Sequence, residues 1–227
     1  NATTWTAQTS GYVLPQLTGV DFFDATHGVL VGGGGAISRT VNGGTNWTVR
    51  TSATSDYLTS VDFVSTQIGY AVNTLGTAVK TTNGGRTWTP ITTSGNTNGL
   101  FGIDFIDADT GWAVGYWGKI IKTEDGGATW TTQVAGAGAD LHGVRFVNAT
   151  TGWACGAMGT IVKTTNGGTD WNPQTSGAGT VLRGIDFFDA QNGCAVGWDG
   201  TVVKTTNGGT DWTPGVSGTT DPLYDVD

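Results

Sequence analysis

The chain has 227 residues and a formal net charge of −8, and 12% of its residues are charged, about half the share in most soluble domains. The acidic net charge and the lack of any basic run argue against nucleic acid and anionic membranes as partners. No apolar run reaches the ~18 residues of a membrane-spanning helix. Glycine accounts for 39 residues and glutamate for one, which disfavours long helices and indicates an all-β protein.

The first pattern along the chain is a predicted strand that begins with Leu and ends with Phe, with alternating apolar residues between them. It recurs at residues 17–22, 58–63, 100–105, 141–146 and 182–187. A polar turn and a second predicted strand follow each copy, for example Trp112 to Val114. A short glycine-bearing hairpin then leads to a third strand, and a fourth strand begins at a Trp, as in residues 88–91.

A turn of the form Thr-x-(Asn/Asp)-Gly-Gly-x-x-Trp, here called the Gly-Gly turn, joins the third and fourth strands, because Asn, Asp and Gly tolerate the positive φ that a tight reversal needs. Its third position holds Asn42, Asn83, Asp125, Asn166 and Asn207. Its last position holds Trp47, Trp88, Trp130, Trp171 and Trp212, which are spaced 41, 42, 41 and 41 residues apart. A fixed period of this length marks a repeat architecture.

Four short antiparallel strands in each period predict the blade of a β-propeller, because a lone blade cannot bury both of its faces. An open β-solenoid fits less well, since its coils are usually much shorter. We expect a single domain over residues 1–227, with five blades at approximately 17–50, 58–91, 100–133, 141–174 and 182–216. Overlapping terminal strands are expected at 3–9 and 223–227, an overlap that a piece cut from a longer array would also show.

The recurring turn resembles the Asp-box, or bacterial-neuraminidase repeat. The fuller pattern, with Val-Asp-Phe, Gly-Trp-Ala-Val-Gly and Lys-Thr-Thr-Asn-Gly-Gly-x-x-Trp-Thr, is similar to photosystem II stability and assembly factor-like propellers. The resemblance covers essentially the whole chain and implies the propeller fold. It implies little about function, because proteins of many roles, including exported bacterial ones, carry this repeat. Only Asp125 keeps the acid of the Asp-box, although Asn can accept the same backbone hydrogen bonds.

The Gly-Gly turns and their tryptophans are predicted to be structural. Calcium requires six to eight oxygen ligands with several carboxylates, whereas four of the five turns carry Asn, so we expect neither a metal nor a cofactor. A ring of basic residues precedes the turns and is expected to satisfy first-strand aspartates or turn carbonyls. Its members are Arg39, Lys80, Lys122, Lys163 and Lys204.

The hairpin between the second and third strands varies while its surroundings repeat. Variation confined to one face of a repeat protein is typical of a binding surface, and exposed aromatic residues suit sugars or protein partners. The second residue of each first strand also varies and is expected on the same face. The candidate ligand-binding residues are Tyr116, Trp117, Trp198, Asp199, Phe101, His142 and Arg183. Packing of this rim against neighbouring loops is the alternative.

Few residues could carry catalysis. A sialidase-like site needs an arginine triad with a Tyr/Glu pair, and the single glutamate, Glu124, lies in a turn on the opposite predicted face. The two histidines, His27 and His142, are also expected on opposite faces. Cys155 and Cys194 occupy equivalent second strands of adjacent blades, and we expect both to be buried free thiols.

These patterns predict a non-catalytic recognition or scaffold module that binds a protein partner through one face of the propeller. A carbohydrate-binding, lectin-like propeller is the alternative, and a sialidase- or glycosidase-like enzyme is less favoured. The Thr-, Gly- and Asn-rich composition indicates a secreted or extracytoplasmic bacterial protein whose signal peptide has been removed. We expect it to be part of a larger parent protein, without insertion into a membrane.

Overall fold

The computed structural model describes residues 7–10, 16–93, 98–136 and 138–227. These residues form five four-stranded antiparallel sheets, each with its strands in sequence order, so the predicted all-β propeller with five blades is confirmed. No helix in the described ranges is long and apolar enough to cross a membrane.

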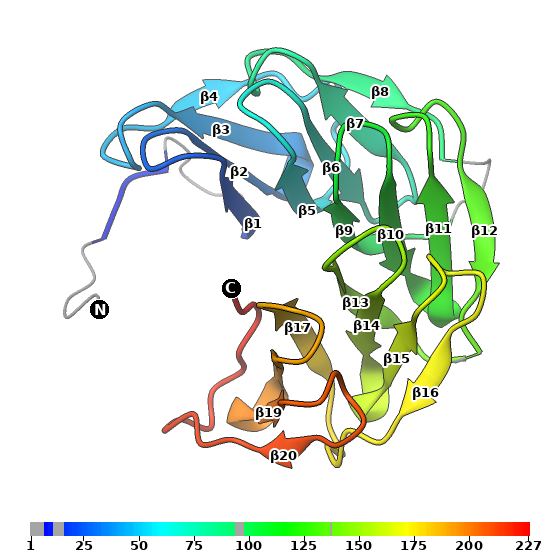
Figure 1. Cartoon of the computed structure of the whole chain (residues 1–227). Helices are drawn as coiled ribbons and strands as arrows, with labels where there is room; N and C mark the ends of the chain where they lie inside the picture. The colour runs from blue at the N-terminus through cyan, green and yellow to red at the C-terminus, as the bar shows by residue number, and fades with distance from the viewer. Residues whose placement is uncertain (1–6, 11–15, 94–97, 137) are drawn as a thin grey trace.

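Each blade is one sheet, numbered here by its place in the chain (Figure 1). Blade 1 contains β1 (Leu17–Phe22), β2 (Gly28–Gly32), β3 (Ala36–Thr40) and β4 (Thr48–Arg50). Blade 2 contains β5 (Leu58–Phe63), β6 (Gly69–Asn73), β7 (Ala78–Thr81) and β8 (Thr89–Ile91). Blade 3 contains β9 (Leu100–Phe105), β10 (Gly111–Gly115), β11 (Lys119–Thr123) and β12 (Thr131–Val134).

The last two blades follow the same plan. Blade 4 contains β13 (Leu141–Phe146), β14 (Gly152–Gly156), β15 (Ile161–Thr164) and β16 (Asn172–Gln174). Blade 5 contains β17 (Leu182–Phe187), β18 (Gly193–Gly197), β19 (Val202–Thr205) and β20 (Thr213–Pro214). Single 3-10 turns join the second and third strands of four blades: η1 (Gly33–Gly35), η2 (Tyr116–Gly118), η3 (Ala157–Gly159) and η4 (Trp198–Gly200).

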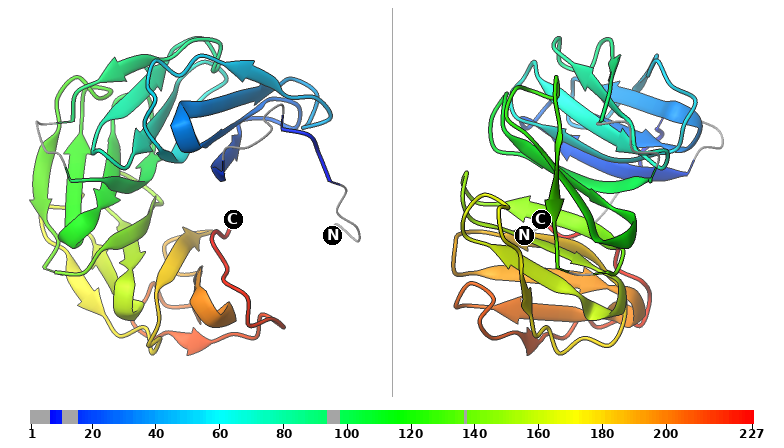
Figure 2. Two further views of the ribbon diagram at one scale, coloured as in Figure 1. Left: turned by 180° about the vertical axis from the view of Figure 1, so that it is seen from behind. Right: turned by 90° about the vertical axis from the view of Figure 1, so that its right-hand side faces the viewer.

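The first strands of the blades lie side by side around the centre, in the order β1, β5, β9, β13 and β17. Figures 1 and 2 show that the blades follow an arc, with an opening between blade 1 and blade 5 where the C-terminus lies. The hydrophobic core therefore consists of separate layers between successive sheets rather than one central cluster.

The recurring Phe at the end of each first strand organises these layers. The ring of Phe105 stacks on Tyr70 of the preceding blade, with ring centroids 3.7 Å apart, and meets Trp130 of its own blade edge-on at 6.0 Å. Phe146 and Phe187 make the same pair of contacts in the next two blades. The edge-to-face contact is a favourable geometry for an aromatic pair, and the parallel pair buries the full face of each ring. The Trp of the Gly-Gly turn is buried in blades 2 to 5, whereas Trp47 of blade 1, which was also expected to pack between sheets, is partly exposed.

A glycine at the start of each second strand makes room for this ring. A Cβ atom on Gly111 would lie 2.4 Å from the ring of Phe105, and Gly152 stands in the same relation to Phe146. No other residue type could occupy these positions without moving the aromatic ring, which explains the recurring Gly before the second-strand aromatic residue.

Carboxylates of the first strands also join successive blades. Asp21, Asp62 and Asp104 accept hydrogen bonds from the backbone N–H groups of Phe63, Phe105 and Phe146 in the following blade, at 2.7–2.8 Å. At the fourth interface Arg145 replaces the carboxylate. Its guanidinium lies between Asp104 and Asp186, with Nη1 3.5 Å from Asp104 Oδ1 and Nε 3.0 Å from Asp186 Oδ1.

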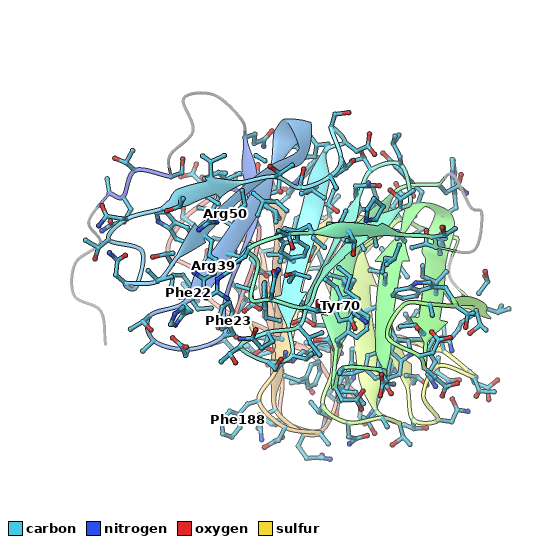
Figure 3. All side chains as sticks on the ribbon, turned by 90° about the horizontal axis from the view of Figure 1, so that it is seen from above. Phe22, Phe23, Arg39, Arg50, Tyr70 and Phe188 are labelled. Carbon is cyan, nitrogen blue, oxygen red and sulfur yellow. The ribbon has the colours of Figure 1, made fainter. Side chains whose placement is uncertain are left out.

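Three members of the basic ring bind turn carbonyls, which was one of the two kinds of partner expected from the sequence. Arg39, Lys80 and Lys163 donate to the carbonyl of the first glycine in the next blade's Gly-Gly turn. Arg39 is labelled in Figure 3. Lys122 instead pairs with Glu124 at 2.8 Å. Lys80 and Lys163 also lie over the aromatic ring of their own second strand, which adds a cation–π contact.

The Gly-Gly turns are closed by their own side chains. Thr40 Oγ1 accepts the N–H of Gly44, and Asn42 Oδ1 accepts the N–H of Asn46, at 2.9 Å in both cases. The other four turns repeat both bonds. Because the Asn or Asp oxygen is already used within the turn, these hydrogen bonds support the structural interpretation.

Both cysteines are free thiols, as predicted. Cys155 is fully buried, and burial raises the pKa of its thiol to about 12. Cys194 is half-buried rather than buried, because it faces the side of blade 5 that no further sheet covers.

Replacing Trp130 with Ala should lower the free energy of unfolding by about 3–5 kcal/mol, because it removes a buried ring beside Phe105. Chemical denaturation measures this loss. Trp47→Ala is a matched control, since Trp47 holds the same repeat position with a half-exposed ring, and its loss should be clearly smaller. Equal losses, or a loss below about 1 kcal/mol for Trp130→Ala, would contradict the role of the aromatic layer.

A second prediction concerns the carboxylates between blades. Burial raises the pKa of Asp62 well above its usual value, with further contributions from Asp104 and Asp21, and burial raises the pKa of Asp104 to about 6 despite Arg145. A raised pKa in the folded state means that the acid form is favoured by folding. The stability contributed by these groups is therefore fully present below about pH 4, the ordinary carboxyl pKa, and is lost as the pH rises through the raised value.

Asp62→Asn should consequently raise Tm at pH 7.5, because the amide oxygen can still accept the N–H of Phe105 without a buried charge. The gain in Tm should shrink toward zero near pH 4. For a domain of this size, a gain in stability of about 1 kcal/mol corresponds to a rise in Tm of roughly 2–4 °C. Asp107→Asn is the control and should lower Tm at pH 7.5. Hydrogen bonds from the backbone N–H groups of Asp109 and Thr110 lower the pKa of Asp107, so folding favours its charged form. If the Tm difference between Asp62→Asn and the wild type did not depend on pH, the pKa of Asp62 could not be raised in the folded state.

Candidate recognition site

A central cavity of about 760 Å³ is lined by the first strands of the five blades and by the C-terminal residues. The carboxylates of Asp21, Asp62, Asp104 and Asp186 line its wall, with Arg145 among them. These acids are occupied in the contacts between blades described above. The wall is therefore negative, and its charged groups are held in place by backbone hydrogen bonds.

The residues at one mouth of this cavity are placed by β-bulges. In every first strand the pairing with the second strand skips the second residue, as between Leu100 and Gly102 or between Leu141 and Gly143. A bulge leaves one residue unpaired and redirects its side chain. The unpaired residues are the variable ones recognised in the sequence: Thr18, Thr59, Phe101, His142 and Arg183.

Five side chains form a continuous row at this mouth, here called the mouth row. Tyr116 meets Phe101 edge-on with ring centroids 4.5 Å apart, and Phe101 lies 4.9 Å from the His142 ring. Nδ1 of His142 is 3.5 Å from a guanidinium nitrogen of Arg183, and the guanidinium carbon of Arg183 lies 5.4 Å from the Trp198 ring centroid. The row thus combines four aromatic or imidazole rings with one guanidinium.

Electrostatics separate the roles of the two polar members of the row. Burial, reinforced by the nearby charge of Arg183, lowers the pKa of His142 to about 4, so its ring is neutral at pH 7. The guanidinium of Arg183 carries a positive charge. An anionic group is consequently attracted to Arg183 at the mouth and repelled by the carboxylates deeper in the cavity.

Seven ligand-binding residues were predicted from the sequence, and the mouth row contains five of them. Of the other two, Trp117 is 74% exposed at the hairpin tip, and its backbone N–H donates to Asp140 at 2.8 Å. Asp199 is exposed at the equivalent position of η4. These two residues and Met158 have φ of 56–60°, where blade 1 has Gly34. Positive φ is costly for residues other than glycine, so these three hairpins hold backbone strain at an exposed position.

Tyr57, Asp140 and Tyr224 also belong to this mouth and were missed by the sequence analysis. Tyr57 and Tyr224 line the cavity, and Asp140 holds the hairpin that carries Trp117. The residue just before each first strand accepts a bond from the hairpin, as the Tyr57 carbonyl does from the N–H of Thr74. Variation at that position between repeats is the sequence signal that marks these residues.

No group of three or more potential metal ligands occurs within the described part of the chain. The Gly-Gly turns lie apart from the mouth row, and their Asn or Asp oxygens are engaged within each turn. The mouth row offers four rings and one guanidinium to a ligand.

Comparisons with known proteins agree with this fold. The family model of photosynthesis system II assembly factor YCF48 matches residues 2–100 and 93–175. A structure of YCF48 bound to D1 peptide has 18% identity and a TM-score of 0.61, covering 88% of this chain and 81% of that chain. YCF48 from Cyanidioschyzon merolae has 18% identity and a TM-score of 0.54, covering 92% of this chain and 88% of that chain.

An ancestral GH74 enzyme has 17% identity and a TM-score of 0.74, covering 100% of this chain and 35% of that chain. At such identities the solved structures show the fold alone. No functionally curated protein matches the sequence. Because the two matched ranges together span more than half of the sequence, the chain belongs to the photosynthesis system II assembly factor YCF48 family.

Proposed function

We propose that this chain is a non-catalytic recognition module that binds a protein partner through the mouth row. The observation that carries the proposal is the row itself, a continuous line of rings and one guanidinium at the positions that vary between repeats. Tyr, Trp and Arg are the residues that most often dominate the energy of protein interfaces. The structure of YCF48 bound to D1 peptide supports the proposal, because that family member holds a peptide.

The row suits an extended segment of polypeptide. Phe101, Tyr116 and Trp198 offer apolar surfaces, and Arg183 offers a cation whose nearest ring partners are uncharged. The segment would lie across the mouth rather than enter the cavity, since the carboxylates of the wall disfavour other acids there. We further propose that the protein acts outside the cytoplasm as part of a larger assembly.

Carbohydrate binding is the second candidate. Trp117 is 74% exposed and Trp198 is 42% exposed, and flat indole faces are suitable platforms for sugar rings. An enzymatic role is less favoured, because the cavity carboxylates that could act as acid and base already accept hydrogen bonds that join the blades.

The triple substitution Tyr116→Ala, Trp117→Ala and Trp198→Ala should leave folding intact, because these side chains are 38–74% exposed. Peptides selected by phage display on the wild-type chain should bind the triple variant at least about 30-fold more weakly, corresponding to ~2 kcal/mol. Titration calorimetry measures both affinities. Selection of no peptide, together with binding on a glycan array, would favour the carbohydrate alternative.

The control triple replaces Thr26, Asp109 and Gln191 with Ala, at exposed turns outside the mouth row. It should bind the selected peptides with wild-type affinity. Unfolding of the aromatic triple, or equal binding by both triples, would rule out the mouth row as the recognition surface.

Trp117→Gly tests the same surface with less change to the fold. Glycine adopts a φ of 60° without strain, so the Tm of this variant should equal or exceed that of the wild type. The free energy of unfolding should rise by up to about 1 kcal/mol. Its affinity for the selected peptides should fall, because the exposed indole is lost. A marked drop in Tm would show that the Trp117 ring has a packing role instead.

A further inference from the structure

Three of the five arginines of the chain meet at the interface of blades 1 and 2, and are here called the arginine cluster. Arg39 lies on β3, Arg50 on β4, and Arg86 in the Gly-Gly turn of blade 2. Arg50 pairs with Ile37, and side chains two residues apart on a strand share a face, so Arg39 and Arg50 both point toward blade 2. Figure 3 labels both residues on blade 1. Arg39 lies at the opposite end of β3 from η1, away from the mouth row.

The guanidinium of Arg39 is held over the turn that carries Arg86. Arg39 is only 6% exposed, and its Nε donates to the carbonyl of Gly84 at 2.5 Å. A Cβ atom on Gly85 would lie 3.8 Å from Cδ of Arg39. Within the described ranges the guanidinium makes no other hydrogen bond. Both of its terminal nitrogens can therefore donate to a further acceptor.

No carboxylate neutralises the arginine cluster. None of its three members forms an ion pair with another described residue. Burial and then the charges of Arg86 and Arg50 lower the pKa of Arg39, and Asp24 makes the smallest contribution, in the opposite direction. The carboxylate of Asp24 instead accepts the N–H groups of its own turn. The cluster thus gathers like charges in a chain whose net charge is −8.

The indole N–H of Trp88 adds a buried donor to this interface. Trp88 is 4% exposed, and in the described structure neither its Nε1 nor Nε of Arg50 has a hydrogen-bond partner. At the interface of blades 3 and 4, Trp171 donates to Oε1 of Gln133 at 3.3 Å. Gln133 holds the repeat position of Arg50, so between blades 1 and 2 a cationic donor stands in place of an acceptor. Leaving buried donors without a partner is costly.

The combination of an unpartnered indole with several cations is specific to Trp88 among the described interfaces. Trp130 and Trp212 also lack a partner for Nε1, but the position of Arg50 is held there by Ile91 and Gln174, which are uncharged. The chemistry that complements the interface of blades 1 and 2 is therefore an anion with several acceptor atoms.

We propose that the arginine cluster and the Trp88 indole bind a tetrahedral oxyanion, a phosphate or sulfate group, between blades 1 and 2. Such a group has acceptors in every direction and suits donors that approach from two sheets, whereas the two oxygens of a carboxylate are matched by a single guanidinium. Arg86 is exposed and Arg50 is partly exposed, so the group can enter from the rim. The ligand is either the free anion or the end group of a small molecule, since both present the same acceptors.

Phosphate should stabilise the full chain, because it binds between two sheets of the folded state. At pH 7.5, about 20 mM inorganic phosphate should raise Tm by at least about 3 °C over a chloride buffer of equal ionic strength. Titration calorimetry with inorganic phosphate and with phenyl phosphate measures the two affinities. Tighter binding of the inorganic ion identifies a free anion as the ligand, and tighter binding of the ester identifies a phosphate end group.

Arg50→Gln is the main variant, because Gln is the residue that blade 3 carries at this position. In chloride it should raise Tm, since the amide oxygen can accept the N–H of Trp88 and the repulsion on Arg39 is reduced. It should bind phosphate at least about tenfold more weakly, because a charged donor is lost.

Two further variants complete the test. Arg86→Gln, at an exposed site, should leave Tm in chloride nearly unchanged and weaken phosphate binding at least about threefold. Lys204→Gln is the matched control, since Lys204 is an exposed cation at the repeat position of Arg39 in blade 5. It should bind phosphate with wild-type affinity.

The indole N–H signals report the location of the anion. In nitrogen-15 NMR spectra the signal of Trp88 should shift when phosphate is added, whereas that of Trp130 should not. Trp88→Phe assigns the signal, because it keeps an aromatic ring and removes the N–H.

Several results would overturn the proposal. One is an equal Tm in phosphate and in chloride. Another is a phosphate-dependent gain in Tm that Arg50→Gln retains in full, which would be a general effect of the salt on the protein. A loss of affinity in Lys204→Gln as large as that in Arg50→Gln, or a Trp88 signal that does not respond to phosphate, would also exclude this site.

Discussion

The fold depends on one contact repeated between blades, a Phe ring held between two other aromatic rings. Phe105 stacks on Tyr70 from the preceding sheet and meets Trp130 of its own sheet edge-on, while its backbone N–H is held by Asp62. Ring and N–H together fix the distance and the register of adjacent sheets. Stability is therefore distributed over interfaces between nearest neighbours, as expected for repeat proteins.

The hydrogen bonds from backbone N–H groups to first-strand aspartates explain the charge of the central cavity. Each aspartate that captures a backbone N–H across an interface must lie on a first strand, and the first strands form the cavity wall. Joining the blades thus produces a ring of desolvated acids, and burial raises the pKa of Asp62 and Asp104. Arg145, in the place of the fourth aspartate, lies close to Asp104 and Asp186 and reduces the repulsion between acids.

Recognition is separated from this framework by the β-bulges. The bulged residue of each first strand makes no ladder pair, so its side chain can vary without changing the register of the sheet. In blades 3 to 5 this freedom brings Phe101, His142 and Arg183 together in the mouth row. The repeat can thereby keep identical interfaces and still present a surface that differs from blade to blade.

The blades could be predicted from the sequence, because the spacing of strands and Gly-Gly turns is a local property of each repeat. The sequence also predicted that the turn tryptophans pack between sheets, as they do in blades 2 to 5, and that basic residues such as Lys80 meet either first-strand aspartates or turn carbonyls. Features that depend on the angle between sheets could be seen only in the three-dimensional fold: the open arc, the exposed Phe22 and Phe188, and the contact of His142 with Arg183. These features join residues of different repeats, and no local pattern encodes the distance between them.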